Sequence, residues 1–302
     1  PEPDAAAATD YLDALRREVG CTALAGLRIA LDCAHGAASR LAGRLFTGLG
    51  ATVEVLFDRP DGANINRGCG STHPDALAAR VREGGFDLGF AYDGDADRSL
   101  LVDELGQVRD GDAMMFLWAT ALAESGELEP RAIVATSMSN LGLERALAAR
   151  AVRVLRCDVG DREVVRTLKA NGLRLGGEQS GHIVDLARST TGDGLLTSAV
   201  LAARVAKAGA PVSELLSGFR RYPQLLVNVP VREKPALATL PRVAEAAGEV
   251  ERRLGADGRL VLRYSGTEPL ARIMLEGPDE DALHALAEGL ATAIRAEIGT
   301  QG

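Results

Sequence analysis

The chain has 302 residues and a formal net charge of −8, from 42 acidic and 34 basic side chains. Nucleic acid and anionic membranes are bound by clustered basic surfaces, so this charge disfavours both as partners. Hydrophobic residues make up 46% of the sequence, which suffices for folded cores, and the length suits two or three domains. With no signal peptide and no apolar run of membrane-spanning length, the sequence predicts a cytoplasmic protein.

The first elements in chain order are a helix and a strand–helix–strand unit. Apolar residues at helical spacing predict an amphipathic helix within residues 1–19, with Thr9 as its N-cap. Segments 27–31 and 52–57 have the composition of strands, and the segment between them predicts a helix at about 38–48. This alternation is typical of a βαβ crossover and of a mainly parallel sheet.

A second unit of the same kind follows the apolar segment 113–123, which predicts a buried helix. Residues 131–156 again run from strand to polar loop to helix to strand. Two copies of the pattern predict two related mixed α/β domains with mainly parallel sheets, at about 21–112 and 113–222. The remainder, 223–302, predicts a small C-terminal α+β domain of three strands and two helices.

Residues 93–98 place three carboxylates at alternate positions and an arginine directly after them: Asp-Gly-Asp-Ala-Asp-Arg. Two carboxylates about 4 Å apart repel by roughly 4 kcal/mol at an effective dielectric of about 20. A shared cation would remove this repulsion, and ligation by oxygen alone favours Mg²⁺. An EF-hand is excluded, because Arg98 stands where that loop needs glycine. The pattern predicts a metal site at Asp93, Asp95 and Asp97, with an acidic solvated turn as the alternative.

The segment 175–184 is a glycine-rich turn between apolar residues, LGGEQSGHIV. Glu178 and Ser180 offer a carboxylate and a hydroxyl for paired hydrogen bonds to sugar hydroxyls. His182 is one of four histidines and is suited to proton transfer near neutral pH. Taken alone, the segment is equally compatible with a structural turn that contains a histidine.

The segment 261–275 places small polar residues and arginines between two strands, VLRYSGTEPLARIML. Backbone N–H groups, hydroxyls and guanidinium groups of this kind can bind a phosphate dianion. The residues concerned are Arg263, Ser265, Gly266, Thr267 and Arg272. The alternative is a hairpin turn whose polar side chains bind no ligand.

These three motifs, in this order on successive domains, resemble the motifs of the α-D-phosphohexomutase family. The likeness runs from about residue 21 to the end of the chain. Within the family, the segments GEQSGH, DGANINRGCGSTHP, MSNLGLE, VGDR and TTGDGLL resemble the phosphoglucosamine mutases more than the phosphomannomutases and phosphoglucomutases. Those other branches remain an alternative.

The resemblance implies a phosphotransferase-type isomerase that uses Mg²⁺ and small sugar phosphates and acts in amino-sugar nucleotide and cell-wall precursor synthesis. It implies that a phosphoserine and a 1,6-bisphosphate carry the phosphoryl group between glucosamine 6-phosphate and glucosamine 1-phosphate. A homodimer is one option for its assembly. The implied site residues are Asp93, Asp95 and Asp97 for the metal; Arg98 beside the transferred phosphoryl group; Glu178 and Ser180 for sugar hydroxyls; His182 for proton transfer; Asp161 and Arg162 near the sugar; and Arg263, Ser265, Gly266, Thr267 and Arg272 for the non-reacting phosphate.

The sequence also departs from the family, because it contains no phosphoserine loop of the Ser-His-Asn-Pro type. We therefore expect residues 1–20 to be the last helix of a first domain that this chain lacks. We also expect the chain alone to bind glucosamine phosphates weakly and to show no mutase turnover.

Two other functions compete with this interpretation. A phosphatase with an aspartyl nucleophile would use the same acidic motif, but Ser99 stands where that class has Thr or Val. A non-catalytic sugar-phosphate-binding module is the second. Ser71, Thr72 and His73 also have the residue types of a nucleophilic serine site, but the sequence contains no Ser-His-Asp arrangement or nucleophile-elbow motif. Thr72 and Asp75 have the spacing of a capping box, which predicts the start of a helix there.

Overall fold

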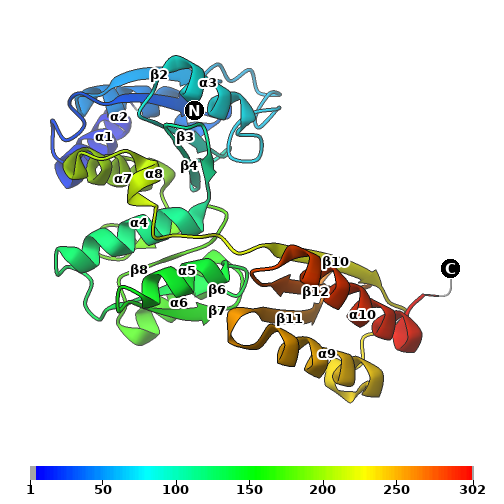
Figure 1. Ribbon diagram of the computed structural model, residues 1–302. Helices are drawn as coiled ribbons and strands as arrows, with labels where there is room; N and C mark the ends of the chain where they lie inside the picture. Colours follow the sequence, from blue (N-terminus) through cyan, green and yellow to red (C-terminus); the bar gives the residue numbers. More distant parts are fainter. Residues whose placement is uncertain (1–4, 301–302) are drawn as a thin grey trace. The chain divides into compact units, whose positions relative to one another are not determined.

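The computed structural model describes residues 5–300 (Figure 1). The chain divides into two compact units. The first comprises Pro1–Ser139 with Leu143–Arg220, and the second comprises Asn140–Gly142 with Arg221–Gly302. Within the described range, no helix is both long and apolar enough to cross a membrane.

The first sheet of unit 1 has five strands in the order β2-β1-β3-β4-β5. Their bounds are β1 Arg28–Asp32, β2 Thr52–Leu56, β3 Leu88–Tyr92, β4 Ser99–Asp103 and β5 Val108–Arg109. Strands β2, β1 and β3 are parallel, whereas β4 and β5 are antiparallel to their neighbours. The sheet is therefore mixed, and the three aspartates lie on the β3–β4 connection, between two strands as expected.

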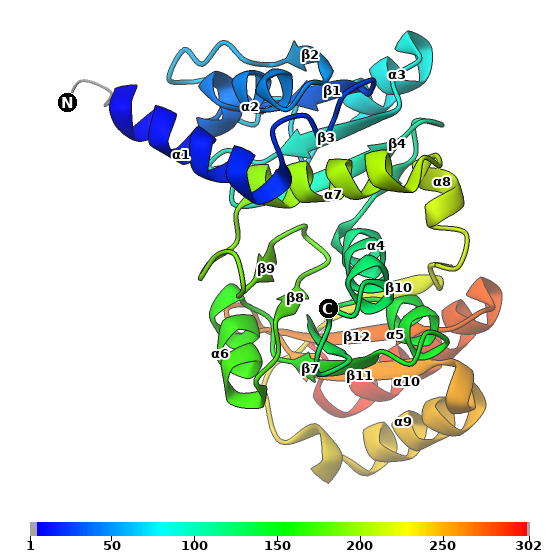
Figure 2. The same cartoon turned by 90° about the vertical axis from the view of Figure 1, so that its left-hand side faces the viewer.

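Helices cover both faces of this sheet (Figures 1 and 2). The helices α1 (Ala5–Val19), α2 (Ala42–Gly48) and α7 (Gly194–Ala208) share one apolar core with β1 and β3, and α3 (Asp75–Gly84) packs on the other face. The predicted N-cap of the first helix is wrong, because the helix already runs from Ala5 and Thr9 lies inside it. The helix predicted at 38–48 is a 3₁₀ turn, Ala37–Arg40, followed by α2.

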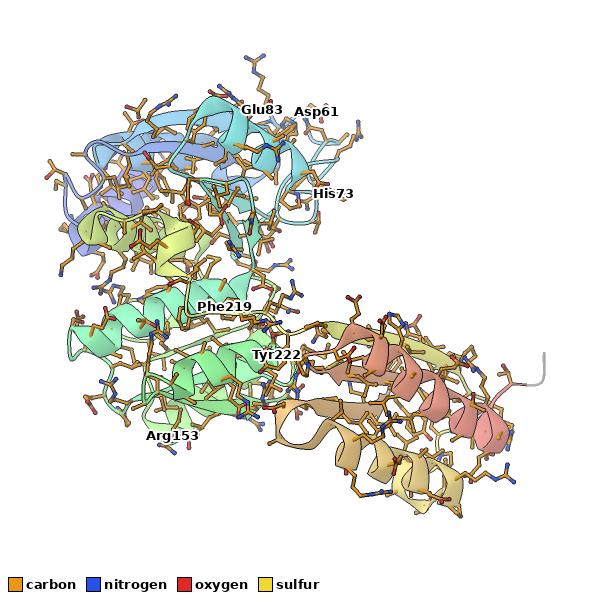
Figure 3. The ribbon with its side chains drawn as sticks, viewed as in Figure 1. Asp61, His73, Glu83, Arg153, Phe219 and Tyr222 are labelled. Carbon is orange, nitrogen blue, oxygen red and sulfur yellow. The ribbon has the colours of Figure 1, made fainter. Side chains whose placement is uncertain are left out.

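A long loop joins β2 to α3, and Figure 3 labels Asp61 and His73 on it. The predicted capping box is wrong, since Pro74 precedes the helix without a side-chain cap. The Thr72 hydroxyl instead lies 3.1 Å from Nδ1 of the exposed His73. The exposed His73 is thus paired with Thr72, and not with the Ser71 that a nucleophilic serine site would use.

The second sheet of unit 1 has the order β7-β6-β8-β9, with only β9 antiparallel. Its strands are β6 Ala132–Thr136, β7 Arg153–Cys157, β8 Leu175–Gly177 and β9 Ile183–Asp185. Helix α6 (Asp161–Asn171) packs on one face. On the other lie α4 (Gly111–Glu124), which is the expected buried helix, and α5 (Leu141–Ala148). The short helix α8 (Val212–Leu215) follows α7.

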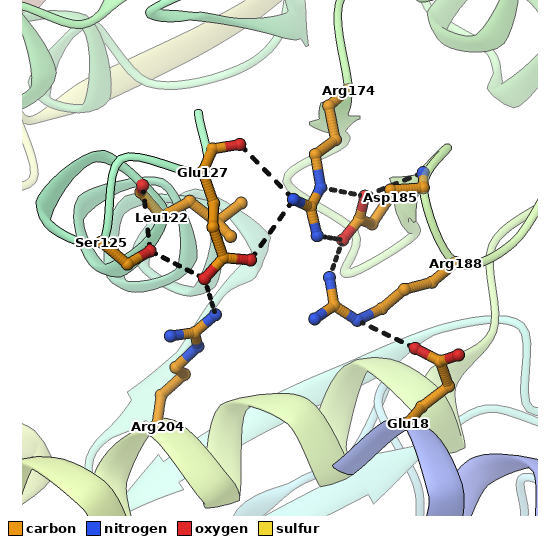
Figure 4. A network of polar contacts seen from close by, with 9 residues as sticks. Glu18, Leu122, Ser125, Glu127, Arg174, Asp185, Arg188 and Arg204 are labelled. Atoms are coloured by element: carbon orange, nitrogen blue, oxygen red, sulfur yellow. Dashed lines mark hydrogen bonds and ion pairs between the residues drawn. The ribbon is translucent and has the colours of Figure 1, made fainter. Parts of the chain in front are cut away.

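A buried carboxylate ties several elements of unit 1 together (Figure 4). Asp185, at the end of β9, accepts hydrogen bonds from Arg174 at 2.7 and 2.9 Å and from Arg188. Arg188 also lies 3.6 Å from Glu18 of α1, and Arg174 lies 3.5 Å from Glu127 beyond α4. Burial alone would raise the pKa of Asp185, but the hydrogen bonds and charges of the arginines outweigh it and hold the pKa below its ordinary value.

Unit 2 is a three-stranded antiparallel sheet with two helices. The strand order is β10-β12-β11, with β10 Gln224–Pro230, β11 Arg259–Tyr264 and β12 Leu270–Glu276. Helices α9 (Pro241–Leu254) and α10 (Glu280–Ile298) share one apolar core with the sheet. Short 3₁₀ turns at Leu237–Thr239 and Gly255–Asp257 flank α9.

Candidate active site

The β3–β4 loop, residues 93–98, brings the three predicted aspartates together; we call it the metal loop. One carboxylate oxygen from each of Asp93, Asp95 and Asp97 lies within 4.8 Å of the others. Ala96 has a φ of 62°, so the backbone turns sharply between the last two of them. The donors are carboxylate oxygens only, and their clustering fits a hard divalent cation such as Mg²⁺.

Arg98 is the immediate counter-charge of the metal loop. Its Nε donates to Asp93 Oδ2 at 2.6 Å and to Asp97 Oδ1 at 3.3 Å. Burial disfavours its charge, but the two carboxylates outweigh burial and raise the pKa of Arg98, which therefore stays protonated. The loop carries three carboxylates and one guanidinium, so negative charge remains for a cation to neutralise.

The loop after β1 supports the metal loop from the sheet. The backbone N–H of Ala37 donates to the Gly94 carbonyl at 2.9 Å, and a Cβ on Gly36 would overlap that carbonyl. The buried Asp32 accepts backbone hydrogen bonds from Ala34 and Gly70, both at 2.8 Å. Burial raises the pKa of Asp32, and these two hydrogen bonds oppose the shift. The role of Asp32 is to hold the loop in shape.

The segment between β8 and β9, residues 178–182, docks beside the metal loop, against the starts of β4 and α4; we call it the sugar loop. The Ser99 N–H donates to the Gly181 carbonyl at 3.3 Å, and the Gly111 N–H donates to the Gln179 carbonyl at 3.0 Å. A Cβ on Gly181 would overlap the Ser99 carbonyl oxygen, and one on Gly111 would overlap that of Glu178. Glycine is therefore required at both positions for the backbones to approach this closely.

One side-chain contact joins the two loops directly. His182, which is 4% exposed, places Nδ1 3.1 Å from Asp97 Oδ2. On the other side of the ring, Gly192 lies so close to Nε2 that a Cβ there would overlap it. Within residues 5–300, Nε2 has no hydrogen-bond partner. His182 is thus held in one orientation, with Nδ1 toward the metal loop.

The remaining sugar-loop residues connect it to the start of α6. Glu178 Oε1 accepts the Gly160 N–H at 2.8 Å, and Ser180 Oγ donates to Glu178 Oε2 at 3.3 Å. Asp161 and Arg162, the first residues of α6, line a pocket of about 380 Å³ together with His182. Unit 1 therefore gathers the expected metal and sugar residues around two docked loops.

Replacing Gly181 by alanine should separate the two loops. Gly181 has a φ of +92°, and its Cβ would overlap Ser99. Strain and overpacking together predict a loss of about 2 kcal/mol in the free energy of unfolding, measured in urea. Gly172→Ala is the matched control, because its φ is +61° but no atom lies within 4 Å of the added Cβ. Equal losses for both variants would show that the overlap with Ser99 adds nothing to the loss of unfolding free energy caused by the positive φ.

The expected phosphate-binding residues lie in unit 2, on the turn from β11 to β12. Arg263 and Arg272 are paired directly across the two strands, where like charges repel unless an anion lies between them. Ser265 is 3% exposed, and Lys234 Nζ donates to its carbonyl at 2.7 Å. Glu268 accepts a hydrogen bond from Arg272 at 2.7 Å. Gly266 and Thr267 are exposed at the tip of the turn.

Sequence reasoning missed several members of both sites. Lys234 was overlooked because it stands about thirty residues before the turn that it contacts. The two basic residues of the segment REKP, directly after an apolar strand, could have indicated it. Gly111 and Gly192 carried no signal of their own, because their roles come from contacts with distant segments.

Models of three successive domains of one family match the chain. They are described as phosphoglucomutase/phosphomannomutase alpha/beta/alpha domain II, alpha/beta/alpha domain III and the C-terminal domain. They match residues 9–106, 110–222 and 226–293, respectively.

Curated relatives are phosphoglucosamine mutases. That of Geobacillus kaustophilus is 47% identical over 291 residues, which are 96% of this chain and 65% of the relative. That of Anaeromyxobacter dehalogenans is 50% identical over 276 residues, which are 91% of this chain and 60% of the relative. The chain thus spans less than two thirds of the length of these relatives.

Solved structures show the same fold at lower identity. A phosphoglucomutase/phosphomannomutase family protein from Burkholderia thailandensis aligns with a TM-score of 0.78 and 24% identity, covering 97% of this chain and 66% of that one. The N-acetylphosphoglucosamine mutase of Aspergillus fumigatus, solved with GlcNAc-6P and magnesium, aligns with a TM-score of 0.76 and 21% identity, covering 96% and 66%. The chain therefore belongs to the phosphoglucomutase/phosphomannomutase family and carries its domains II, III and IV.

Proposed function

We propose that this chain forms the metal, sugar and phosphate sites of a mutase that interconverts glucosamine 6-phosphate and glucosamine 1-phosphate for cell-wall precursor synthesis. The observation that carries the proposal is the contact between His182 and Asp97, which joins the sugar loop to the metal loop. The sequence identity between this chain and phosphoglucosamine mutases supports glucosamine as the sugar. We infer domains at 21–112, 113–222 and 223–302, preceded by the helix α1 (Ala5–Val19).

In unit 1, some of the site residues lie beside the transferred phosphoryl group, and the others bind the sugar. Asp93, Asp95 and Asp97 would hold Mg²⁺, which would supply positive charge beside the phosphoryl group. Arg98 supplies a second positive charge beside it. The Glu178 carboxylate accepts hydrogen bonds from sugar hydroxyls, and the Ser180 hydroxyl donates one to them. His182 keeps Asp97 in place through the contact between Nδ1 and Oδ2, and its imidazole is the group suited to proton transfer.

The pocket at the start of α6 binds the sugar, and the turn of unit 2 binds the phosphate that is not being transferred. Asp161 and Arg162 line the pocket at the start of α6. In unit 2, the phosphate site consists of Arg263, Ser265, Gly266, Thr267 and Arg272. The transferred group moves between O6 and O1, so the 1,6-bisphosphate is held in two opposite orientations. A phosphate site on a separate unit can hold either phosphate, and catalysis then rests on positioning and charge stabilisation.

Removing one arginine of the phosphate site should weaken substrate binding. We expect Arg272→Ala to raise the dissociation constant of glucosamine 6-phosphate about tenfold, because a charge-assisted hydrogen bond is lost. Isothermal titration calorimetry measures this change. Arg295→Ala is the matched control, since Arg295 forms an exposed ion pair with Glu288 in the same unit. A similar loss in both variants would contradict a phosphate site at Arg272.

A coupled mutase assay tests the proposed function as a whole. It compares glucosamine, glucose and mannose 6-phosphates, with the chain alone and with a fusion that adds the N-terminal third of the Geobacillus kaustophilus enzyme. We expect turnover only in the fusion, fastest with glucosamine 6-phosphate. Faster turnover of glucose or mannose 6-phosphate would place the chain in another branch of the family.

A further inference from the structure

The first turn of α7 touches the metal loop, as the loop after β1 does. The backbone N–H of Gly194 donates to the carbonyl of Ala96 at 2.9 Å. A Cβ on Gly194 would lie 2.7 Å from the Arg98 carbonyl oxygen and 2.8 Å from that of Ala96. Ala96 and Arg98 flank Asp97, one of the three carboxylates. A displacement of this turn must therefore displace the metal loop.

Two tyrosines hold this turn from different elements. Tyr11 of α1 donates its hydroxyl to both carboxylate oxygens of Asp193, at 3.0 and 2.9 Å. The hydroxyl of Tyr92, the last residue of β3, lies 2.7 Å from Ser198 Oγ, which in turn donates to the Gly194 carbonyl at 2.7 Å. Tyr92 and Ser198 are fully buried, so their contact belongs to the core. Tyr11 is only partly buried and reaches the turn from a segment 182 residues away in sequence.

Asp193 connects Tyr11 to the turn. It is the N-cap of α7, and its Oδ1 accepts the backbone N–H of Leu196 at 2.9 Å. Burial and the neighbouring Asp193 carboxylate raise the pKa of Tyr11, so its phenol remains a donor at all physiological pH values. The aspartate is thereby fixed from both sides, by its own helix and by α1.

We propose that Tyr11 is a positioning residue for the metal loop, acting through Asp193 and Gly194. This inference rests on the proposed metal site at Asp93, Asp95 and Asp97. The Tyr11 hydroxyl fixes the Asp193 carboxylate, Asp193 fixes the first turn of α7, and Gly194 holds the loop at Ala96. Helix α1 thus contributes to metal affinity without touching the metal.

The test is the affinity of the chain for Mn²⁺, a stand-in for Mg²⁺ that electron paramagnetic resonance detects directly. We expect Tyr11→Phe to raise the Mn²⁺ dissociation constant about fivefold, the effect of one lost hydrogen bond. Tyr264→Phe is the matched control, because its hydroxyl donates to the Pro235 carbonyl in unit 2, and it should leave Mn²⁺ affinity unchanged. Gly194→Ala tests the second link and should weaken Mn²⁺ binding as well, since its Cβ presses on the loop backbone.

A double-mutant cycle separates positioning from general stability. If Tyr11 acts through Asp193, Tyr11→Phe should have no further effect on Mn²⁺ affinity in an Asp193→Ala background. Asp193→Asn should retain most of the affinity, because asparagine caps a helix and can accept the tyrosine hydrogen bond. A lower melting temperature with unchanged Mn²⁺ affinity for Tyr11→Phe would overturn the proposal. Absence of Mn²⁺ binding by the unaltered chain would instead overturn the metal site, and the role of Tyr11 with it.

Discussion

Asp95→Asn is expected to lower the affinity of the chain for Mn²⁺ about a hundredfold, because it removes one of three charged ligands. Asp95 is the exposed member of the cluster, whereas Asp93 and Asp97 both pair with Arg98. The substitution therefore changes ligation while leaving the ion pairs of the loop in place. Electron paramagnetic resonance of free Mn²⁺ measures the change directly.

The matched control is Asp13→Asn on the surface of α1, which removes an equal charge far along the sequence from the metal loop. Asp13 pairs with Arg16 and is about half exposed, so only a small effect on stability is expected. Undiminished Mn²⁺ binding by Asp95→Asn would mean that the three carboxylates form a solvated acidic turn. Arg98 alone would then be their counter-charge.

Asp185→Ala should lower the free energy of unfolding at pH 7 by about 3–5 kcal/mol, because it leaves Arg174 and Arg188 without their buried partner. Urea unfolding measures this loss. Glu163→Ala provides the comparison, since Glu163 pairs with Arg166 on the exposed face of α6 and its removal should cost less than about 1 kcal/mol. Equal small losses would show that the Asp185 network is energetically neutral.

The pH dependence of this stabilisation has a definite sign. The folded-state pKa of Asp185 lies below its ordinary value of 3.8, so the folded state binds fewer protons than the unfolded state in that range. The stabilisation is fully present above about pH 4 and is lost as the pH falls through the folded-state pKa. The difference between the original chain and Asp185→Ala should therefore shrink only in acid. A difference that shrinks between pH 5 and 8 would contradict this assignment.

Local signals were sufficient to predict the metal loop and its strands. Apolar runs on both sides of residues 93–98 predicted a loop between strands, and β3 and β4 end and begin at its edges. The three carboxylates could be grouped because their spacing of two residues belongs to one loop. The sugar and phosphate segments were also recognised from their residue types, but only the family resemblance favoured binding sites over structural turns and added Asp161 and Arg162.

Long-range contacts could not be predicted in the same way. Gly181 meets Ser99, and Tyr11 meets Asp193, only because the fold brings distant segments together. Local rules also failed where tertiary structure overrode them. Thr9 has the chemistry of an N-cap, but the helix already runs through it from Ala5. In unit 2, Arg272 and Glu268 are only four residues apart, but the pattern of charges did not predict that they form an ion pair.

The most direct test of the central claim is a calorimetric titration of the chain, in the presence of Mg²⁺, with glucosamine 6-phosphate and with mannose 6-phosphate. The claim is that the sugar loop and the metal loop form one site for an amino-sugar phosphate. It predicts tighter binding of glucosamine 6-phosphate, and a loss of about tenfold in that affinity for Glu178→Ala, which removes a hydrogen bond to a sugar hydroxyl. Equal affinity for both sugars, unaffected by Glu178→Ala, would contradict it.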